Sequence, residues 1–181
     1  MILQIKPVIA GFHLTCAAGG PGASGRGAAG SAHQTAGEEF RILPKKLTGS
    51  AKLIRSGGKT VCETEILREG DRILYLAKQN GTEYAQAELT CRPCSGPVSM
   101  IRPPQGVHLD IRTPYGSWEA DRQNDQSVLF SRASTVIGKI SPFFSIRPQI
   151  FACSGEYPAS LWAVLYVFAA YMMHEGEVDI I

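Results

Sequence analysis

Residues 47–91 constrain the fold most, because they contain four apolar runs separated by short glycine-containing turns. Apolar and polar side chains alternate over Leu47–Ile54, Thr60–Arg68 and Glu83–Cys91. A period of two places the apolar side chains on one face of a β-strand. The run Arg72–Lys78 is more uniformly apolar, which is typical of a strand covered on both faces. The segment therefore predicts four strands.

The breaks between these runs have the composition of tight turns. They read Ser56-Gly57-Gly58, Glu69-Gly70-Asp71 and Gln79-Asn80-Gly81. Glycine and asparagine adopt positive φ at little cost, and Asn-Gly between two apolar runs is a strong hairpin signal. We therefore expect an antiparallel meander with one apolar face, which another apolar element must cover.

Two segments could supply that cover. Cys16–Gly37 is rich in glycine and alanine and is interpreted as a loop or a helix, with a loop favoured in its glycine-dense first half. Ser160–Met173 is apolar on every side, which predicts a buried helix packed on the sheet or shared with a partner subunit. It is shorter than the roughly 20 residues that a helix needs to cross a bilayer, so we expect no membrane span; a tail anchor is the alternative.

The flanks of the central sheet are rich in glycine and proline. Met1–Leu14 fits an edge strand, because Pro7 is tolerated only there. Val107–Arg112 alternates and predicts one further strand, whereas the polar Trp118–Ser131 predicts a loop or short helix. The prolines within Val136–Ile150 exclude a long helix.

Charge and cysteine content limit the partners and the compartment. The formal net charge of +2, with the arginines spread singly along the chain, argues against nucleic acid as a partner. The five cysteines and the lack of a signal-peptide pattern make a reducing, cytoplasmic location the default. Cys91 and Cys94 form a CxxC, but a zinc site needs two further ligands at compatible spacing, so we predict no metal site.

Three pieces between Ala29 and Cys91 point to one family. They are Gly30–His33 followed by Ala36–Phe40, Leu47–Thr60, and Gly81–Cys91. In this order they resemble the end of the central helix, a strand with its following turn, and the last strand of the hotdog-fold acyl-CoA thioesterases of the PaaI-like group.

The resemblance implies an α+β fold in which an antiparallel sheet packs on a helix. The hotdog-like domain would cover residues 1–95, with the Gly/Ala-rich loop or helix at 16–37 and the sheet at 40–91. Residues 96–181 would form a Pro-rich extension that ends in the apolar helix 160–173. The family likeness also implies a homo-oligomer, most simply a homodimer.

The same resemblance implies hydrolysis of an acyl-CoA thioester, with coenzyme A as part of the substrate and no separate cofactor. The backbone N–H of Gly19 or Gly20, at a helix N-terminus, would stabilise the oxyanion. The carboxylate of Glu38 or Glu39, assisted by His33, would position or deprotonate water.

Coenzyme A binding would fall to the turn after the first predicted strand. Arg55 and Lys59, beside Gly57 and Gly58, would contact the phosphates of coenzyme A. No acidic residue precedes Glu38, although the family's helix carries its catalytic carboxylate. This departure favours an alternative: a non-catalytic or degenerate hotdog-like β-rich module that binds an apolar ligand or a protein partner.

Overall fold

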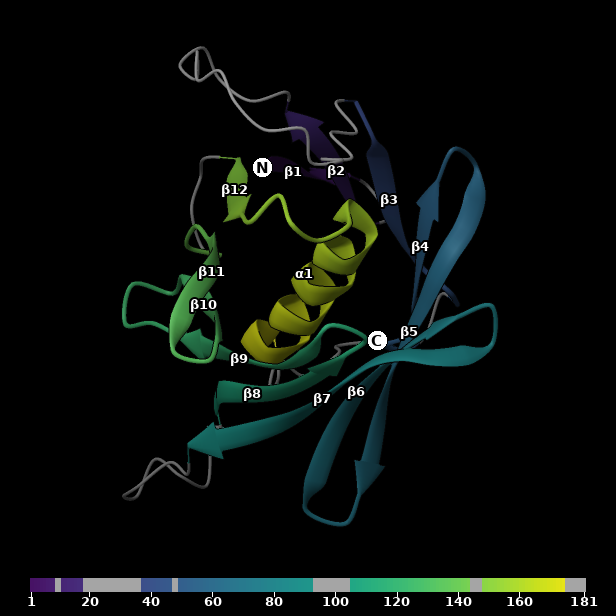
Figure 1. The fold of residues 1–181 in the computed structure, drawn as a ribbon. Helices are drawn as coiled ribbons and strands as arrows, with labels where there is room; N and C mark the ends of the chain where they lie inside the picture. The colour runs from purple at the N-terminus through teal and green to yellow at the C-terminus, as the bar shows by residue number, and fades with distance from the viewer. Residues whose placement is uncertain (9–10, 18–36, 47–48, 93–104, 144–147, 175–181) are drawn as a thin grey trace.

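The structure, a computed structural model, describes residues 1–8, 11–17, 37–46, 49–92, 105–143 and 148–174. In these residues twelve antiparallel strands close into a barrel, and one helix lies inside it (Figure 1). The elements, in chain order, are β1 (Ile2–Val8), β2 (Gly11–Ala17), β3 (Glu39–Pro44), β4 (Lys52–Ser56), β5 (Lys59–Glu69), β6 (Arg72–Gln79), β7 (Thr82–Arg92), β8 (Gln105–Thr113), β9 (Gly116–Arg122), β10 (Val128–Arg132), β11 (Thr135–Ile140), β12 (Gln149–Cys153) and α1 (Ala159–His174).

Each strand pairs with its neighbour in the sequence, and the first strand pairs with the last. In the closing pair, Ile2 lies opposite Ala152 and Ile5 lies opposite Gln149. The barrel therefore joins strands from both ends of the chain and leaves no unpaired strand edge among the described residues.

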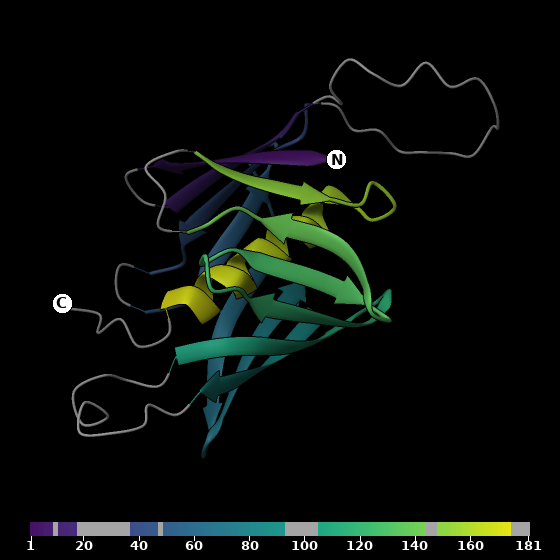
Figure 2. The ribbon, with the colours of Figure 1, turned by 90° about the vertical axis from the view of Figure 1, so that its left-hand side faces the viewer.

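Helix α1 forms the centre of the core (Figure 2). Its side chains from Leu161 to Phe168 are at most 2% exposed, which requires barrel wall on all sides of the helix. Full burial of one large apolar side chain stabilises a protein by about 1.5–3 kcal/mol. A helix that is apolar on all sides must be surrounded by other parts of the protein to keep its side chains out of water.

Polar contacts hold α1 in position. The Tyr171 hydroxyl lies 2.8 Å from the Thr64 hydroxyl of β5 and donates a hydrogen bond to the Ser50 carbonyl at 2.7 Å. Near the other end of the helix, the Trp162 indole donates to the Ser154 carbonyl at 3.1 Å. These bonds tie both ends of the helix to the surrounding chain and add to its apolar packing.

The hotdog-like fold is wrong, and so is the α+β class with an open sheet packed on a helix. In the structure the sheet closes on itself, and the only helix of the described residues follows all the strands in sequence. The resemblance to hotdog-fold thioesterases therefore loses its structural basis. The meander was recognised correctly as β4–β7, because alternation and turns are local signals. Which element covers the apolar face of the meander depends on residues far away in the sequence, so local patterns do not reveal it.

Other sequence predictions can also be compared with the structure. The strand predicted over Val107–Arg112 is confirmed within β8, whereas the edge strand predicted over Met1–Leu14 is wrong, because β1 and β2 form there and each is paired on both sides. The helix predicted at 160–173 is confirmed as α1. The loop or short helix predicted over Trp118–Ser131 is wrong, since β9 and β10 occupy most of it. Trp118 and Ala120 point into the barrel and alternate with outward polar residues, a period of two that the polar composition obscured.

Strands from both predicted segments, 1–95 and 96–181, contribute to the one barrel. Within the described part of the chain, no helix has the length and apolar character needed to cross a membrane.

Candidate functional site

The barrel interior is occupied by the protein's own helix. The aromatic side chains of Trp162, Tyr166 and Phe168 are completely buried there, and Trp162 contacts Phe130 and Phe151 of the wall. Because these side chains pack against the barrel, α1 does not offer its apolar surface to a ligand. Binding groups must be sought on the outer surface and at the rims.

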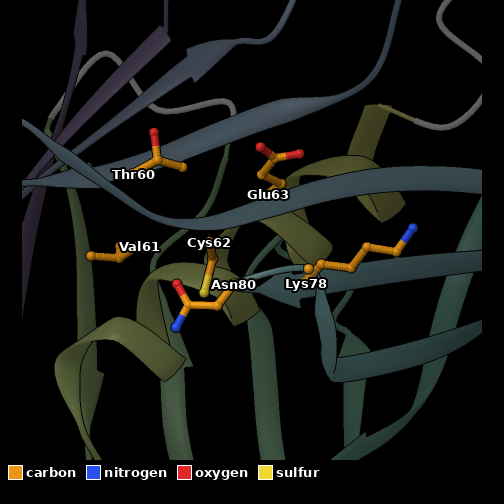
Figure 3. A pocket seen from close by; sticks show the side chains of 7 residues that line it. Thr60, Val61, Cys62, Glu63, Lys78 and Asn80 are labelled. Carbon is orange, nitrogen blue, oxygen red and sulfur yellow. The ribbon is translucent and has the colours of Figure 1, made fainter.

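A surface pocket of about 270 Å³ lies at β5 and the β6–β7 turn (Figure 3). Its residues are Thr60, Val61, Cys62, Glu63, Lys78, Asn80 and Gly81. Burial raises the pKa of the Cys62 thiol to about 11, so the thiol is neutral and a poor nucleophile near pH 7.

The charged groups of this pocket are paired elsewhere. The Glu63 carboxylate accepts a hydrogen bond from Lys45 at 2.6 Å, and Lys78 donates to Glu65 at 2.6 Å. In Figure 3 the Glu63 carboxylate and the Lys78 ammonium point away from Cys62. The pocket therefore assembles no nucleophile with a base.

The predicted catalytic residues are only partly described. Gly19, Gly20 and His33 lie outside the described residues. Glu38 precedes β3, and its carbonyl accepts a hydrogen bond from the Cys16 amide at 3.1 Å. Glu39 is exposed on β3, with its carboxylate 3.4 Å from the His13 imidazole.

The residues predicted to bind coenzyme A do lie together. Arg55 is the last residue but one of β4, Lys59 begins β5, and Gly57 and Gly58 form the turn between the two strands with φ of 56° and 81°. The Arg55 guanidinium donates to the Gly58 carbonyl at 2.9 Å, which holds its side chain over the turn. Both cationic side chains are exposed. Coenzyme A binding itself stays a prediction.

Arg55 also belongs to a larger group that the sequence did not reveal. Strand register places one basic residue directly opposite the next across β1, β2, β3 and β4. We call this group the basic row; its members are Lys6, His13, Arg41 and Arg55. Each alternates with an inward-facing, buried neighbour, so all four side chains lie on the outer face.

Little negative charge compensates the basic row. Glu39 is near His13, whereas Lys6 and Arg41 have no ion-pair partner among the described residues. Adjacent strands are about 4.8 Å apart, so the row spans roughly 14 Å from β1 to β4. The exposed side chains of Lys6, Arg41 and Arg55 are thus held close together, whereas the Nε2 atom of His13 is buried.

A second group runs beside the basic row. Its members are apolar and point outward; we call them the apolar row, Val8, Leu43 and Leu53. Val8 lies two residues after Lys6 on β1, Leu43 two residues after Arg41 on β3, and Leu53 two residues before Arg55 on β4. Leu43 lies directly opposite Leu53. Val8 is 47% exposed, and both leucines are partly exposed and lie outside the core cluster.

A histidine on another part of the barrel has two carboxylate neighbours. The imidazole of His108 lies 2.8 Å from the Asp121 carboxylate and 3.5 Å from that of Asp110. Burial lowers its pKa, but the hydrogen bond to Asp121 and the two negative charges outweigh burial and leave the pKa raised. Among the described residues, no group of His, Cys, Asp and Glu side chains is arranged to hold a metal ion.

The basic row escaped sequence reasoning because its members are far apart in the chain, one to a strand. The interpretation of the arginines as spread singly along the chain overlooked this arrangement. The signal exists only in combination, as one basic residue at an outward position on each of four strands, and the sequence predicted only one edge strand over Met1–Leu14 and the strand Leu47–Ile54 in this region. It needs the register between strands, which alternation alone does not supply.

Comparisons with protein-family models, with curated proteins and with solved structures found no match to this chain.

Proposed function

We propose that this chain is a non-catalytic binding module that holds an anionic partner on the outer face of β1–β4. The observation that carries the proposal is the basic row, in which four neighbouring strands each present one basic side chain at the same level. Arg41 and Arg55 lie directly opposite one another, and like charges so placed in a sheet are destabilising. A bound anion converts that repulsion into attraction, because it faces several cationic groups at once.

The nucleophile candidates of the described residues support binding over covalent catalysis. Burial raises the pKa of Cys62 to about 11 and that of Cys153 to about 12. The His108 imidazole contacts two carboxylates, and no hydroxyl or thiol is hydrogen-bonded to it among the described residues. None of these observations tests the prediction of a thioester hydrolase, but the hotdog fold from which that prediction came is wrong.

Polyanion binding tests the proposal directly. Fluorescent poly-L-glutamate is titrated with the full chain and with the Arg41→Gln and Arg55→Gln double variant. Exposed charge pairs contribute about 0.2–1 kcal/mol each, so the double variant should bind roughly 2- to 30-fold more weakly. Binding should also weaken as salt is raised, because the row is exposed.

Arg112→Gln is the matched control, since Arg112 is exposed on β8, away from the basic row. It should bind like the parent chain. The proposal fails if the parent chain does not bind poly-L-glutamate at low salt, or if the control loses as much affinity as the double variant.

Binding of coenzyme A and hydrolysis of a panel of acyl-CoAs test the expectation that the chain is an enzyme. Binding of coenzyme A that depends on Arg55 and Lys59 would fit an anion site at the β4–β5 turn. Hydrolysis of any acyl-CoA that is lost with Glu39→Gln would instead refute a non-catalytic module. Homo-oligomerisation and a cytoplasmic location stay predictions, which light scattering and fractionation can check.

A further inference from the structure

The face that carries the basic row also carries an apolar stripe. The two rows run parallel across β1–β4, and the outward positions that form them are two residues apart along each of three strands. Two residues of a strand span about 6.7 Å, so the rows are close enough for one ligand to contact both. A simple inorganic anion would use the basic row and leave the apolar row bare.

We infer that the anionic partner is an acidic amphipathic helix of another protein, lying across the strands; this rests on the proposed function. Acidic side chains would face the basic row, and apolar side chains would cover Val8, Leu43 and Leu53. The basic row complements the acidic face of such a helix in charge, and the partly exposed Leu43 and Leu53 offer apolar surface to its other face.

The spacing of the rows matches a helix. Successive strands present their basic side chains about 4.8 Å apart, whereas side chains on one helix face recur about every 5.4 Å along the axis. A row of roughly 14 Å therefore corresponds to between two and three helical turns. An extended peptide presents same-face side chains about 6.7 Å apart and falls out of step after two strands.

Two other anionic partners fit the face less well. Proteins that bind single-stranded nucleic acid stack bases on aromatic side chains, and no Phe, Tyr or Trp occupies an outward position of β1–β4 in the described residues. A lipid surface is favoured by several protruding apolar side chains, but of the apolar row only Val8 is largely exposed, and Leu43 and Leu53 are partly covered.

A designed peptide tests the inference. In a capped, fluorescent peptide of about 18 residues, Glu recurs every third or fourth position and Leu fills the adjoining stripe. A second peptide has the same composition arranged with a period of two. We expect the helical peptide to bind the full chain at least fivefold more tightly than the period-two peptide.

Substitutions separate the contributions of the two rows. Leu53→Thr should weaken binding of the helical peptide about three- to tenfold and leave poly-L-glutamate binding unchanged, because only the peptide reaches the apolar row. Ile150→Thr is the matched control, since Ile150 is 48% exposed on β12, outside both rows. It should leave both affinities unchanged.

The outcomes distinguish this inference from the proposed function. If poly-L-glutamate binds but the two peptides bind equally, the helical partner is refuted and the anionic module stands. If phosphatidylserine vesicles or a single-stranded oligonucleotide bind through Arg41 and the helical peptide does not, the partner class is wrong. If no polyanion binds, the proposed function fails with it.

Discussion

The Tyr171 hydroxyl is the polar contact whose removal tests most sharply how α1 is held. It lies 2.8 Å from the Thr64 hydroxyl and 2.7 Å from the Ser50 carbonyl, and Thr64 is only 1% exposed. Tyr171→Phe keeps the ring but leaves both partners unpaired. Each lost or unsatisfied buried hydrogen bond costs about 1 kcal/mol, and more where a group is left fully buried, so we expect a loss of roughly 2–3 kcal/mol.

Thr64→Val should cost less, about 1 kcal/mol, because Tyr171 retains its bond to Ser50. In the double variant the Thr64 hydroxyl is no longer present to be left unpaired. The cost of the double change should therefore fall short of the sum of the single costs by about 1 kcal/mol.

Urea unfolding followed by tryptophan fluorescence measures these energies. Trp162 lies in α1, Trp118 on β9 packs against it, and both are buried. Tyr115→Phe is the control: Tyr115 is 39% exposed, and its change should cost less than about 0.5 kcal/mol. Strict additivity of the Tyr171 and Thr64 changes, or a cost for Tyr171→Phe no larger than for the control, would refute the tether.

Three further outcomes follow from close packing, charge and burial. Gly106→Ala should destabilise the protein by about 1–3 kcal/mol in urea unfolding, because its Cβ would meet the Met172 backbone oxygen at 2.8 Å; Gly155→Ala, with no atom within 4 Å, should not. His108 has a raised pKa, so its stabilising charge is fully present below about pH 6.5 and is lost as pH rises through the folded-state value. The stability difference between the parent chain and His108→Gln should therefore shrink between acidic and mildly alkaline pH; a difference that grows would contradict this sign. Cys62 should resist iodoacetamide at pH 8 in the folded protein and react on unfolding, because its pKa is about 11, and mass spectrometry of the alkylated peptide checks this.

The failure of the hotdog prediction has an identifiable cause. Two of the three pieces, Leu47–Thr60 and Gly81–Cys91, matched strands and a turn that many antiparallel sheets share, and strands β4–β7 do form in this region. Nothing in that segment states how many more strands follow or where the sheet ends. The contact that decides the architecture joins Ile2 to Ala152, far beyond any local pattern.

The candidate site divides in the same way. The turn with Arg55, Gly57, Gly58 and Lys59 could be located from the sequence, because glycine at positive φ and its flanking strands are local. Its extension to Arg41 could not, since pairing between strands depends on a register that spans separate segments of the chain.

By itself, the sequence determined the meander of β4–β7 and the all-round apolar helix α1, because periodicity and turn chemistry act over a few residues. Only the tertiary structure decided that the sheet closes around that helix and that four scattered basic residues become one row. The physical reason is that closure and register come from burying apolar surface across the whole chain, and no short stretch encodes the partner that it will meet.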